Sequence, residues 1–428
     1  MKKSHRVNVG CWLPAAALMF FVALPAAGQD AADPQLAALV AEAAERNPDV
    51  QAARREAAAV RSRIAPAGAL DDPMLEVGVI NVPAESLSLR REDMTMKMIG
   101  LTQRLPYPGK RALRRDLAER EAEAVEQNLQ ELVNRVRRDV KVAYFDLGLT
   151  DESLRLAERN RRVLEQFLSI AEARYGVGQS TQADVLKAQT QVSKMLEELI
   201  KLGRERPMLE AELNRAAGRG AAVRAVNPGP AHAREVSLRL DELRSIARAN
   251  RPQLLAQQRM MDRSVRALDL AQKDYYPDFD VRLSYGQRDN YQDMRREDMI
   301  SFTVAINLPV WRESKRGPRV EEAEAMREQA SAMYQARLNE LDAMLRQQVA
   351  AAEQTLKSVR LYETALLPQA RLTAEASLSA YRVGRVDFFT LLDSRMTVFN
   401  AEVGYAASIA AYNKALAEVE FLTGVPLL

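Results

Sequence analysis

The segment ISFTVAINL, at Ile300 to Leu308, alternates between apolar and polar side chains without a break. The segment FDVRLSYGQR, at Phe279 to Arg288, has the same pattern. A period of two residues places the apolar side chains on one face of an extended chain and the polar side chains on the other. Two such runs, separated by a short polar stretch, predict a β-hairpin over residues 278–309.

A second hairpin is predicted over residues 74–104. Apolar residues alternate with small or charged ones in its first strand, at Leu75, Val77 and Val79. Its second strand carries three methionines on one face, Met94, Met96 and Met98. Thioethers suit Cu(I), so a copper relay is one interpretation of this stripe. An apolar strand face against lipid is the interpretation that we favour.

The five residues RREDM occur twice, at Arg90 to Met94 and at Arg295 to Met299. In both places they stand between the two predicted strands of a hairpin. We expect each copy to close the loop and to begin the second strand.

The repetition extends over the whole chain. The text ARYGVGQSTQADVLKAQ resembles SAYRVGRVDFFTLLDSR 206 positions later, with Tyr175 against Tyr381 and Gly178 against Gly384. Similarity at a fixed offset indicates an internal duplication. The predicted repeats cover residues 36–218 and 240–425, and a turn-rich linker covers 219–239.

Each repeat is predicted to contain a first helix, the hairpin, a very long helix, a glycine turn and a final helix. The helices are predicted at 36–69, 108–174 and 181–217, and again at 241–274, 317–380 and 386–423. From Val136 to Tyr175 the spacing alternates between four and three residues, and most of these positions are apolar. Such a period predicts a left-handed supercoil of packed helices. At ~1.5 Å per residue, about 66 helical residues span on the order of 100 Å.

The N-terminus reads as a secretory signal peptide over residues 1–28. It has a basic start, an apolar run interrupted by Pro14, and small residues before the expected cleavage near Gly28. Cys11 is the only cysteine of the chain and lies inside this segment. The exported protein is therefore expected to have no thiol, no disulfide and no thiolate metal site.

Composition argues against two functional classes. The formal net charge is only +3, which gives no electrostatic reason to bind nucleic acid. The two histidines are His5, in the signal peptide, and His232, in the linker, and the motifs of metalloproteases, serine hydrolases and phosphate loops are missing. We therefore expect no catalytic residue, no resident metal and no cofactor.

The strands have two possible locations. They could cap a soluble sheet, or they could span an outer membrane with the apolar face against lipid. An open sheet in lipid leaves the backbone groups of both edges unsatisfied, at several kcal/mol each. One chain with four strands cannot close a barrel, but three chains supply twelve strands, which enclose a lumen. The expected fold is thus mainly α, a long coiled-coil helical barrel with a membrane β-barrel portion that closes in a homotrimer. The charged RREDM loops would lie at its water-facing rim.

With these features the sequence resembles the TolC-like outer-membrane efflux protein family over nearly all of the mature chain. The segments that carry the resemblance are ERNPDVQAAR, DDPMLEVGV, GLTQRLPYPGKR, RYGVGQSTQADVLKAQ, PDFDVRLSYG and YRVGRVDFFTLLD. The resemblance implies a trimeric duct in the outer membrane of a Gram-negative bacterium, with a periplasmic helical tunnel constricted at its inner tip. It also implies two partners, a periplasmic adaptor protein and an inner-membrane RND-type pump. QRLPYPGKR is most similar to the heavy-metal branch, whose partners export metal cations.

The resemblance implies roles for seven residues near the tip. Gly178 and Gly384 would lie where the adaptor binds. The gate and constriction would consist of Asp184, Tyr381, Arg385, Thr390 and Asp393. Asp184 would contact Tyr381 in a network that holds the tip closed. In a trimer, each carboxylate would form a ring of three, and such a ring favours cations. This chain has Val386 where the family can carry an arginine clamp, and Arg385 lies one residue away.

Three further interpretations remain to be considered. The aromatic residues near the strand ends, Tyr107, Tyr285 and Trp311, could form an interfacial belt or could simply pack. The same duct could serve drug efflux or type I protein secretion in place of metal. A periplasmic coiled-coil scaffold would explain the heptads but not the paired amphipathic strands.

Overall fold

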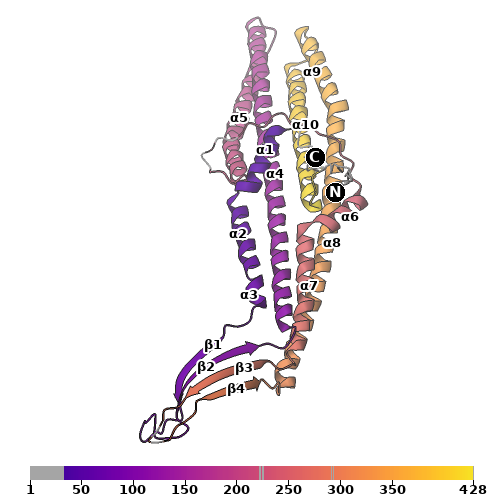
Figure 1. Cartoon of the computed structure of the whole chain (residues 1–428). Helices are drawn as coiled ribbons and strands as arrows, with labels where there is room; N and C mark the ends of the chain where they lie inside the picture. The colour runs from indigo at the N-terminus through magenta and orange to yellow at the C-terminus, as the bar shows by residue number, and fades with distance from the viewer. Residues whose placement is uncertain (1–32, 221–222, 224–225, 291, 293, 428) are drawn as a thin grey trace, which may run out of the picture.

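The computed structural model describes residues 33–427 except 221–222, 224–225, 291 and 293, so the predicted signal peptide lies outside the described residues. The molecule is elongated, with a four-stranded sheet at one end and paired helices extending from it (Figure 1). The helices separate into two pairs toward the far end, α4 with α5 and α9 with α10 (Figure 1). None of the helices within these described ranges is long and apolar enough to cross a membrane.

The sheet confirms the four predicted strands. They are β1 (Met74–Ile80), β2 (Met96–Leu105), β3 (Phe279–Gln287) and β4 (Met299–Ile306). The order is β1-β2-β3-β4, and each neighbouring pair is antiparallel. The central pair, β2 with β3, joins the two halves of the chain.

The two RREDM copies differ in their relation to the strands. The second copy ends on Met299, the first residue of β4, as expected. The first copy ends two residues before β2 and lies wholly in the loop, so the prediction is wrong there. The Thr95 hydroxyl donates to the carbonyl of Asn81 at 2.7 Å, and the Asn81 amide donates to the carbonyl of Met94 at 3.1 Å. Side-chain hydrogen bonds replace the strand ladder at this point.

The strand register defines two faces of the sheet. On one face Ile99 lies opposite Val77 and Tyr285, and Tyr285 lies opposite Ile300. The next level repeats the pattern with Leu75, Leu101, Leu283 and Phe302. Apolar side chains therefore run across all four strands without interruption. The apolar face predicted for these strands is confirmed.

Of the three methionines in the stripe, Met94 lies in the loop before β2, and Met96 and Met98 lie on the opposite, polar face. Met98 is opposite Gly78 and Gly286, and an Arg282 nitrogen lies 3.5 Å from the Met98 sulfur. The side chain of Met96 occupies the space above Gly286, where a Cβ would meet it at 2.4 Å. Our preference for an apolar face is wrong, because in β2 the apolar set is Ile99 and Leu101 and the methionines fill space beside glycines.

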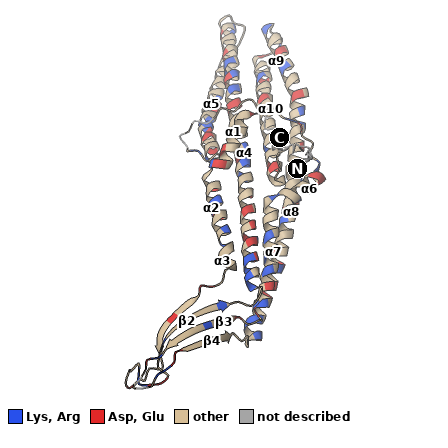
Figure 2. Ribbon diagram, viewed as in Figure 1, with Lys and Arg blue, Asp and Glu red and all other residues tan. Residues whose placement is uncertain are grey.

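Charged strand residues follow the same division. Figure 2 shows charges spread along the helices and few along the strands. On the polar face Arg282 forms an ion pair with Glu76, and Arg104 lies 3.9 Å from Asp280. Lys97 is the exception and lies near the loops, where it pairs with Asp289 at 3.2 Å. The polar face thus keeps its charges in cross-strand pairs.

The first helix of each repeat is broken, contrary to prediction. The helices are α1 (Pro34–Arg46), α2 (Pro48–Ser62) and α3 (Ile64–Gly68) in the first repeat, and α6 (Leu240–Asn250) and α7 (Pro252–Lys273) in the second. Both main breaks precede a proline, Pro48 and Pro252, because the residue before proline is disfavoured in the helical region. Asn47 instead has ψ 126° and caps α2 by accepting a hydrogen bond from the Asp49 amide at 2.8 Å.

The long helices are α4 (Lys110–Gly176), α5 (Gln182–Ala216), α8 (Gly317–Leu361), α9 (Leu367–Arg382) and α10 (Phe388–Thr423). Two π-helical turns, η2 (Arg312–Arg316) and η3 (Tyr362–Leu366), precede α8 and α9. Pro368 lacks an N–H, so η3 adjusts the ladder where a regular helix would lose a hydrogen bond. The predicted helix over 317–380 is therefore α8, η3 and most of α9 in succession.

The heptad positions of α4 form its packed face. Val140, Ala143, Leu147, Leu164 and Ala171 are all at most 5% exposed. Tyr175, the last predicted position, is 49% exposed, because it lies at the end of the helix pair. The core is therefore a thin seam along the helices and not a central globule.

Candidate functional site

The far ends of the two helix pairs are capped in the same way. Gly178 has φ +74° and Gly384 has φ +73°. The Gly178 amide donates to the Tyr175 carbonyl at 3.0 Å, and Gln179 donates to Arg174 at 2.8 Å. The second turn repeats both backbone hydrogen bonds. The Gly384 amide donates to the Tyr381 carbonyl at 3.1 Å, and the Arg385 amide donates to the Ala380 carbonyl at 2.9 Å. This is the Schellman cap, which needs a left-handed residue.

Each cap exposes an apolar side chain. Val177 and Val383, which precede the two glycines, are each 69% exposed. Leu186 and Phe389, in the first turns of α5 and α10, are 54% and 56% exposed. Four large apolar side chains at one end of the molecule constitute a surface suited to a protein partner.

Asp184 is held by its own helix. Its carboxylate accepts hydrogen bonds from the Ser180 hydroxyl at 2.8 Å and from the Thr181 amide at 3.1 Å. The Asp184 amide in turn donates to the Thr181 hydroxyl oxygen at 3.3 Å, which completes a capping box. Burial alone would raise the pKa of the Asp184 carboxyl, but these hydrogen bonds outweigh it and hold the pKa below its ordinary value.

Tyr381 lies in the core of the tip. It is 4% exposed, and its ring meets Phe388 edge-on at 5.6 Å. Its hydroxyl has no hydrogen-bond partner among the described residues, so the bond to Asp184 that the family pattern implies is not made within one chain. The gate assignment of the two residues stays a prediction.

Arg174 connects the two helix pairs and was not among the site residues predicted from the sequence. Its guanidinium lies 4.6 Å from the centre of the Tyr381 ring and donates to the Tyr381 carbonyl at 2.5 Å. Both contacts cross from the end of α4 to the end of α9. No signal in the sequence points to this contact, because Arg174 and Tyr381 are far apart in it and the residue that matches Arg174 in the second repeat is Ala380.

The remaining predicted gate residues are exposed. Asp387 caps α10 and accepts hydrogen bonds from the Thr390 hydroxyl at 2.5 Å and from the Thr390 amide at 2.9 Å. The Thr390 hydroxyl, followed by the amide, lowers the pKa of the Asp387 carboxyl. Arg385 and Asp393 are exposed to solvent. In one chain they are therefore available to a neighbouring molecule.

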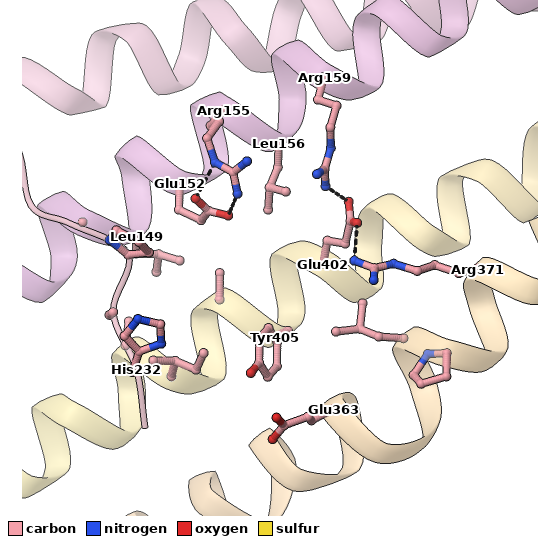
Figure 3. Close-up of a pocket in the computed structure, with 18 residues that line it drawn as sticks. Leu149, Glu152, Arg155, Leu156, Arg159, His232, Glu363, Arg371, Glu402 and Tyr405 are labelled. Atoms are coloured by element: carbon pink, nitrogen blue, oxygen red, sulfur yellow. Dashed lines mark hydrogen bonds and ion pairs between the residues drawn. The ribbon is translucent and has the colours of Figure 1, made fainter. Parts of the chain in front are cut away.

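A cavity of about 590 Å³ lies between α4, α9 and α10, on the sheet side of the tip (Figure 3). In it Glu402, only 8% exposed, accepts from Arg159 at 2.5 Å and from Arg371 at 3.1 Å. These contacts join three helices, as Figure 3 shows. His232 and Tyr405 also line it (Figure 3). Because each cation of this group has a carboxylate partner, we assign the group a structural role.

Within the described ranges, no group of three His, Cys, Asp or Glu residues is placed to hold a metal ion. The three aromatic residues of the predicted interfacial belt differ in their surroundings. Tyr107 stacks on Tyr276 at 4.6 Å and 15°, so it packs at the base of the helices. Trp311 is 69% exposed and Tyr285 42% exposed, at opposite ends of the sheet. The belt stays a prediction for these two residues.

Alternating strands that form one continuous apolar face are typical of outer-membrane proteins. The model of the family described as outer membrane efflux protein matches residues 39–219 and 243–425. The chain belongs to that family, whose members are efflux channels and not enzymes. No curated protein matches the chain in sequence.

Solved structures share the fold. The outer membrane protein VceC from Vibrio cholerae has a TM-score of 0.78 and 17% identity, over 93% of this chain and 98% of its own. CusC has a TM-score of 0.77 and 14% identity, over 92% of each chain. The open state of the MtrE outer membrane channel from Neisseria gonorrhoeae has a TM-score of 0.73 and 16% identity, over 92% and 90%. The resemblance to TolC-like channels is confirmed at this level.

Proposed function

We propose that this chain forms a homotrimeric outer-membrane duct with a periplasmic helical tunnel, as the channel of a tripartite efflux pump. The observation that carries the proposal is the continuous apolar face on a sheet whose outer strands, β1 and β4, each pair with one neighbour among the described residues. In lipid such edges would leave backbone groups unsatisfied at several kcal/mol each. Three copies with twelve strands remove every edge.

Internal duplication is part of the same proposal. The repeats would cover 36–218 and 240–425, with the linker at 219–239. The family match in two segments and the two identical Schellman caps support it. Two hairpins and two helix pairs per chain would then give a ring of six similar units.

The tip would bind the periplasmic adaptor, which links the duct to an inner-membrane RND-type pump. The binding surface would centre on Gly178 and Gly384. The exposure of Val177 and Val383 supports this assignment, since exposed apolar side chains at a rim are the usual contacts of a protein interface.

The gate would be formed by Asp184, Tyr381, Arg385, Thr390 and Asp393. Three copies of the exposed Asp393 around one axis would create a ring of carboxylates that favours cations over anions. The cargo we assign is a heavy-metal cation, on the similarity of QRLPYPGKR to the heavy-metal branch and on this carboxylate ring. A passive duct leaves the final choice of cargo to the pump.

The test is the reversal potential of the purified protein in planar bilayers under a salt gradient. Asp393→Asn should shift the reversal potential toward that of an unselective pore. Glu172→Gln removes a carboxylate from the exposed side of the α4 end and serves as the matched control. If the protein forms channels but Asp393→Asn does not change the reversal potential, the proposed duct stands and the proposed ring of carboxylates is overturned. Absence of channel activity would overturn the duct itself.

A further inference from the structure

The two RREDM loops contact each other within one chain. Arg296, in the β3–β4 loop, donates to the carbonyls of Arg90 and Glu92 in the β1–β2 loop, at 2.9 and 3.2 Å. Its guanidinium also pairs with Asp93 at 2.5 Å, and its side chain is only 6% exposed. In the other direction, Arg90 lies 3.7 Å from Asp289. We call these contacts the loop latch.

The repeat places a corresponding set of residues on the outer sides of the same loops. The RREDM copies are 205 positions apart, so Arg91 corresponds to Arg296, Arg295 to Arg90 and Asp298 to Asp93. Before the loops the offset is 204, from Pro73 and Pro277, which sets Glu85 against Asp289. The strand registers agree with both offsets: Gly78 lies opposite Met98, and the residues that correspond to them, Arg282 and Thr303, also lie opposite each other.

Three of the four residues in this second set are unpaired within the described part of the chain. Arg91, Arg295 and Glu85 are exposed, and none has a hydrogen-bond or ion-pair partner among the described residues. Asp298 accepts from the Arg288 amide at 3.0 Å and from the Tyr285 hydroxyl, and it is exposed to further donors. Two cations and two carboxylates thus stand at the rim in the arrangement of the loop latch, but without its other half.

We propose that a second copy of this chain supplies that other half. When β4 of one copy pairs with β1 of the next, the β4–β1 junction repeats the geometry of β2 with β3, because all neighbouring strands are antiparallel. Arg295 then pairs with Glu85 of the next copy. Arg91 of the next copy reaches Asp298 of the first copy. It also reaches the backbone carbonyls of the RREDM residues that precede Asp298 in the first copy. A closed ring contains three latches within chains and three between them.

The inference rests on the proposed trimeric duct and adds which residues join its subunits. It also gives RREDM a reason to occur twice, since each copy donates an arginine to the loop on one side and accepts one from the other. The two partners of each pair must carry opposite charges. Reversing the charge of one partner therefore places like charges together, and reversing both charges restores the attraction.

Two double-cysteine variants of the full chain in its detergent-solubilised or membrane form distinguish the possibilities. Arg295→Cys with Glu85→Cys, treated with a short bifunctional thiol reagent, should give covalent dimers and trimers on a denaturing gel. Arg90→Cys with Asp289→Cys is the matched control and should react within one chain, without a change in oligomer size. The native Cys11 lies in the predicted signal peptide and does not interfere.

A trimer that assembles but gives no covalent oligomer, while the control pair reacts, overturns the latch and leaves the duct. Failure to assemble as a trimer at all overturns both. In support, Arg295→Glu should lower the temperature at which the trimer dissociates, and Arg295→Glu with Glu85→Arg should restore it. No restoration in the double reversal would count against the pairing.

Discussion

At the residue scale, Arg174 is a polar link between the two helix pairs at the tip, beside the apolar cluster that contains Phe167 and Tyr381. It combines a cation–π contact with a charged hydrogen bond to the same residue, Tyr381, and such contacts are worth about 1–3 kcal/mol together. Its loss would let the helix pairs move apart without unfolding either one.

Arg174→Ala should therefore raise single-channel conductance in planar bilayers, because it releases the contact between α4 and α9. Arg382→Ala is the control, since Arg382 is exposed at the same tip and has no partner among the described residues. Equal conductance in the wild type and both variants would show that the contact does not limit the opening.

Asp184 predicts a pH dependence of the same region. Its pKa is lower in the folded chain than its ordinary value of 3.8, so its stabilising contribution is complete above that value and is lost as pH falls through the folded pKa. Amides at the start of α5 should lose hydrogen-exchange protection in strongly acidic solution, after correction for intrinsic rates. Asp184→Asn should lessen this dependence. A profile that is the same in the variant would assign it to other groups.

The tip also shows how far sequence reasoning reached. The capping role of Asp184 could have been predicted from the sequence, because Thr181 precedes it by three residues, as in a capping box. The Arg174 contact could not, because it depends on how two distant helix pairs pack. The family pattern pointed to a bond between Asp184 and Tyr381, whereas in one chain the carboxylate satisfies its own helix end.

At the scale of elements, the glycine turns are under a backbone constraint and not a steric one. A Cβ at Gly178 would meet nothing within 4 Å, and at Gly384 only an arginine nitrogen at 3.8 Å. The need for glycine comes from the positive φ alone, which costs other residues about 1–2 kcal/mol.

Gly178→Ala and Gly384→Ala should each destabilise the tip by about 1 kcal/mol, measured as faster hydrogen exchange in the adjoining helix ends. Gly176→Ala is the matched control. Gly176 also has open space around its Cβ position, but it is the last residue of α4 and has no positive φ, so alanine there should be neutral or slightly stabilising. A similar loss at all three positions would mean that the turns tolerate no side chain for another reason.

The elements were predictable where a pattern is long and local. The four strands and the long helices follow from periods of two and of three and a half residues. The breaks before Pro48 and Pro252 could have been predicted by the same reasoning, since the helical region is disfavoured for the residue before a proline. The face on which the methionines lie could not be predicted in this way. Both faces of β2 carry apolar residues, and only its pairing with β1 and β3 shows which face continues the apolar face of the sheet.

At the scale of the whole molecule, the two faces of the sheet should differ in their tolerance of charge. Phe302 is on the apolar face, opposite Leu283, and is 68% exposed in the single chain. Its neighbour Ser301 is on the polar face, opposite Ser284. If the apolar face meets lipid, a lysine there costs about 2–4 kcal/mol near the bilayer centre, whereas a lysine on the other face meets water.

Phe302→Lys should therefore reduce the amount of trimer that assembles in outer membranes, and Ser301→Lys should leave it nearly unchanged. The two substitutions introduce the same charge one residue apart in β4, so any general effect of lysine on the strand is shared between them. Assembly is measured as the fraction of folded protein extracted from membranes only by detergent. An equal loss in both variants would mean that the faces are not divided between lipid and water. A loss confined to Ser301→Lys would reverse the assignment of the two faces.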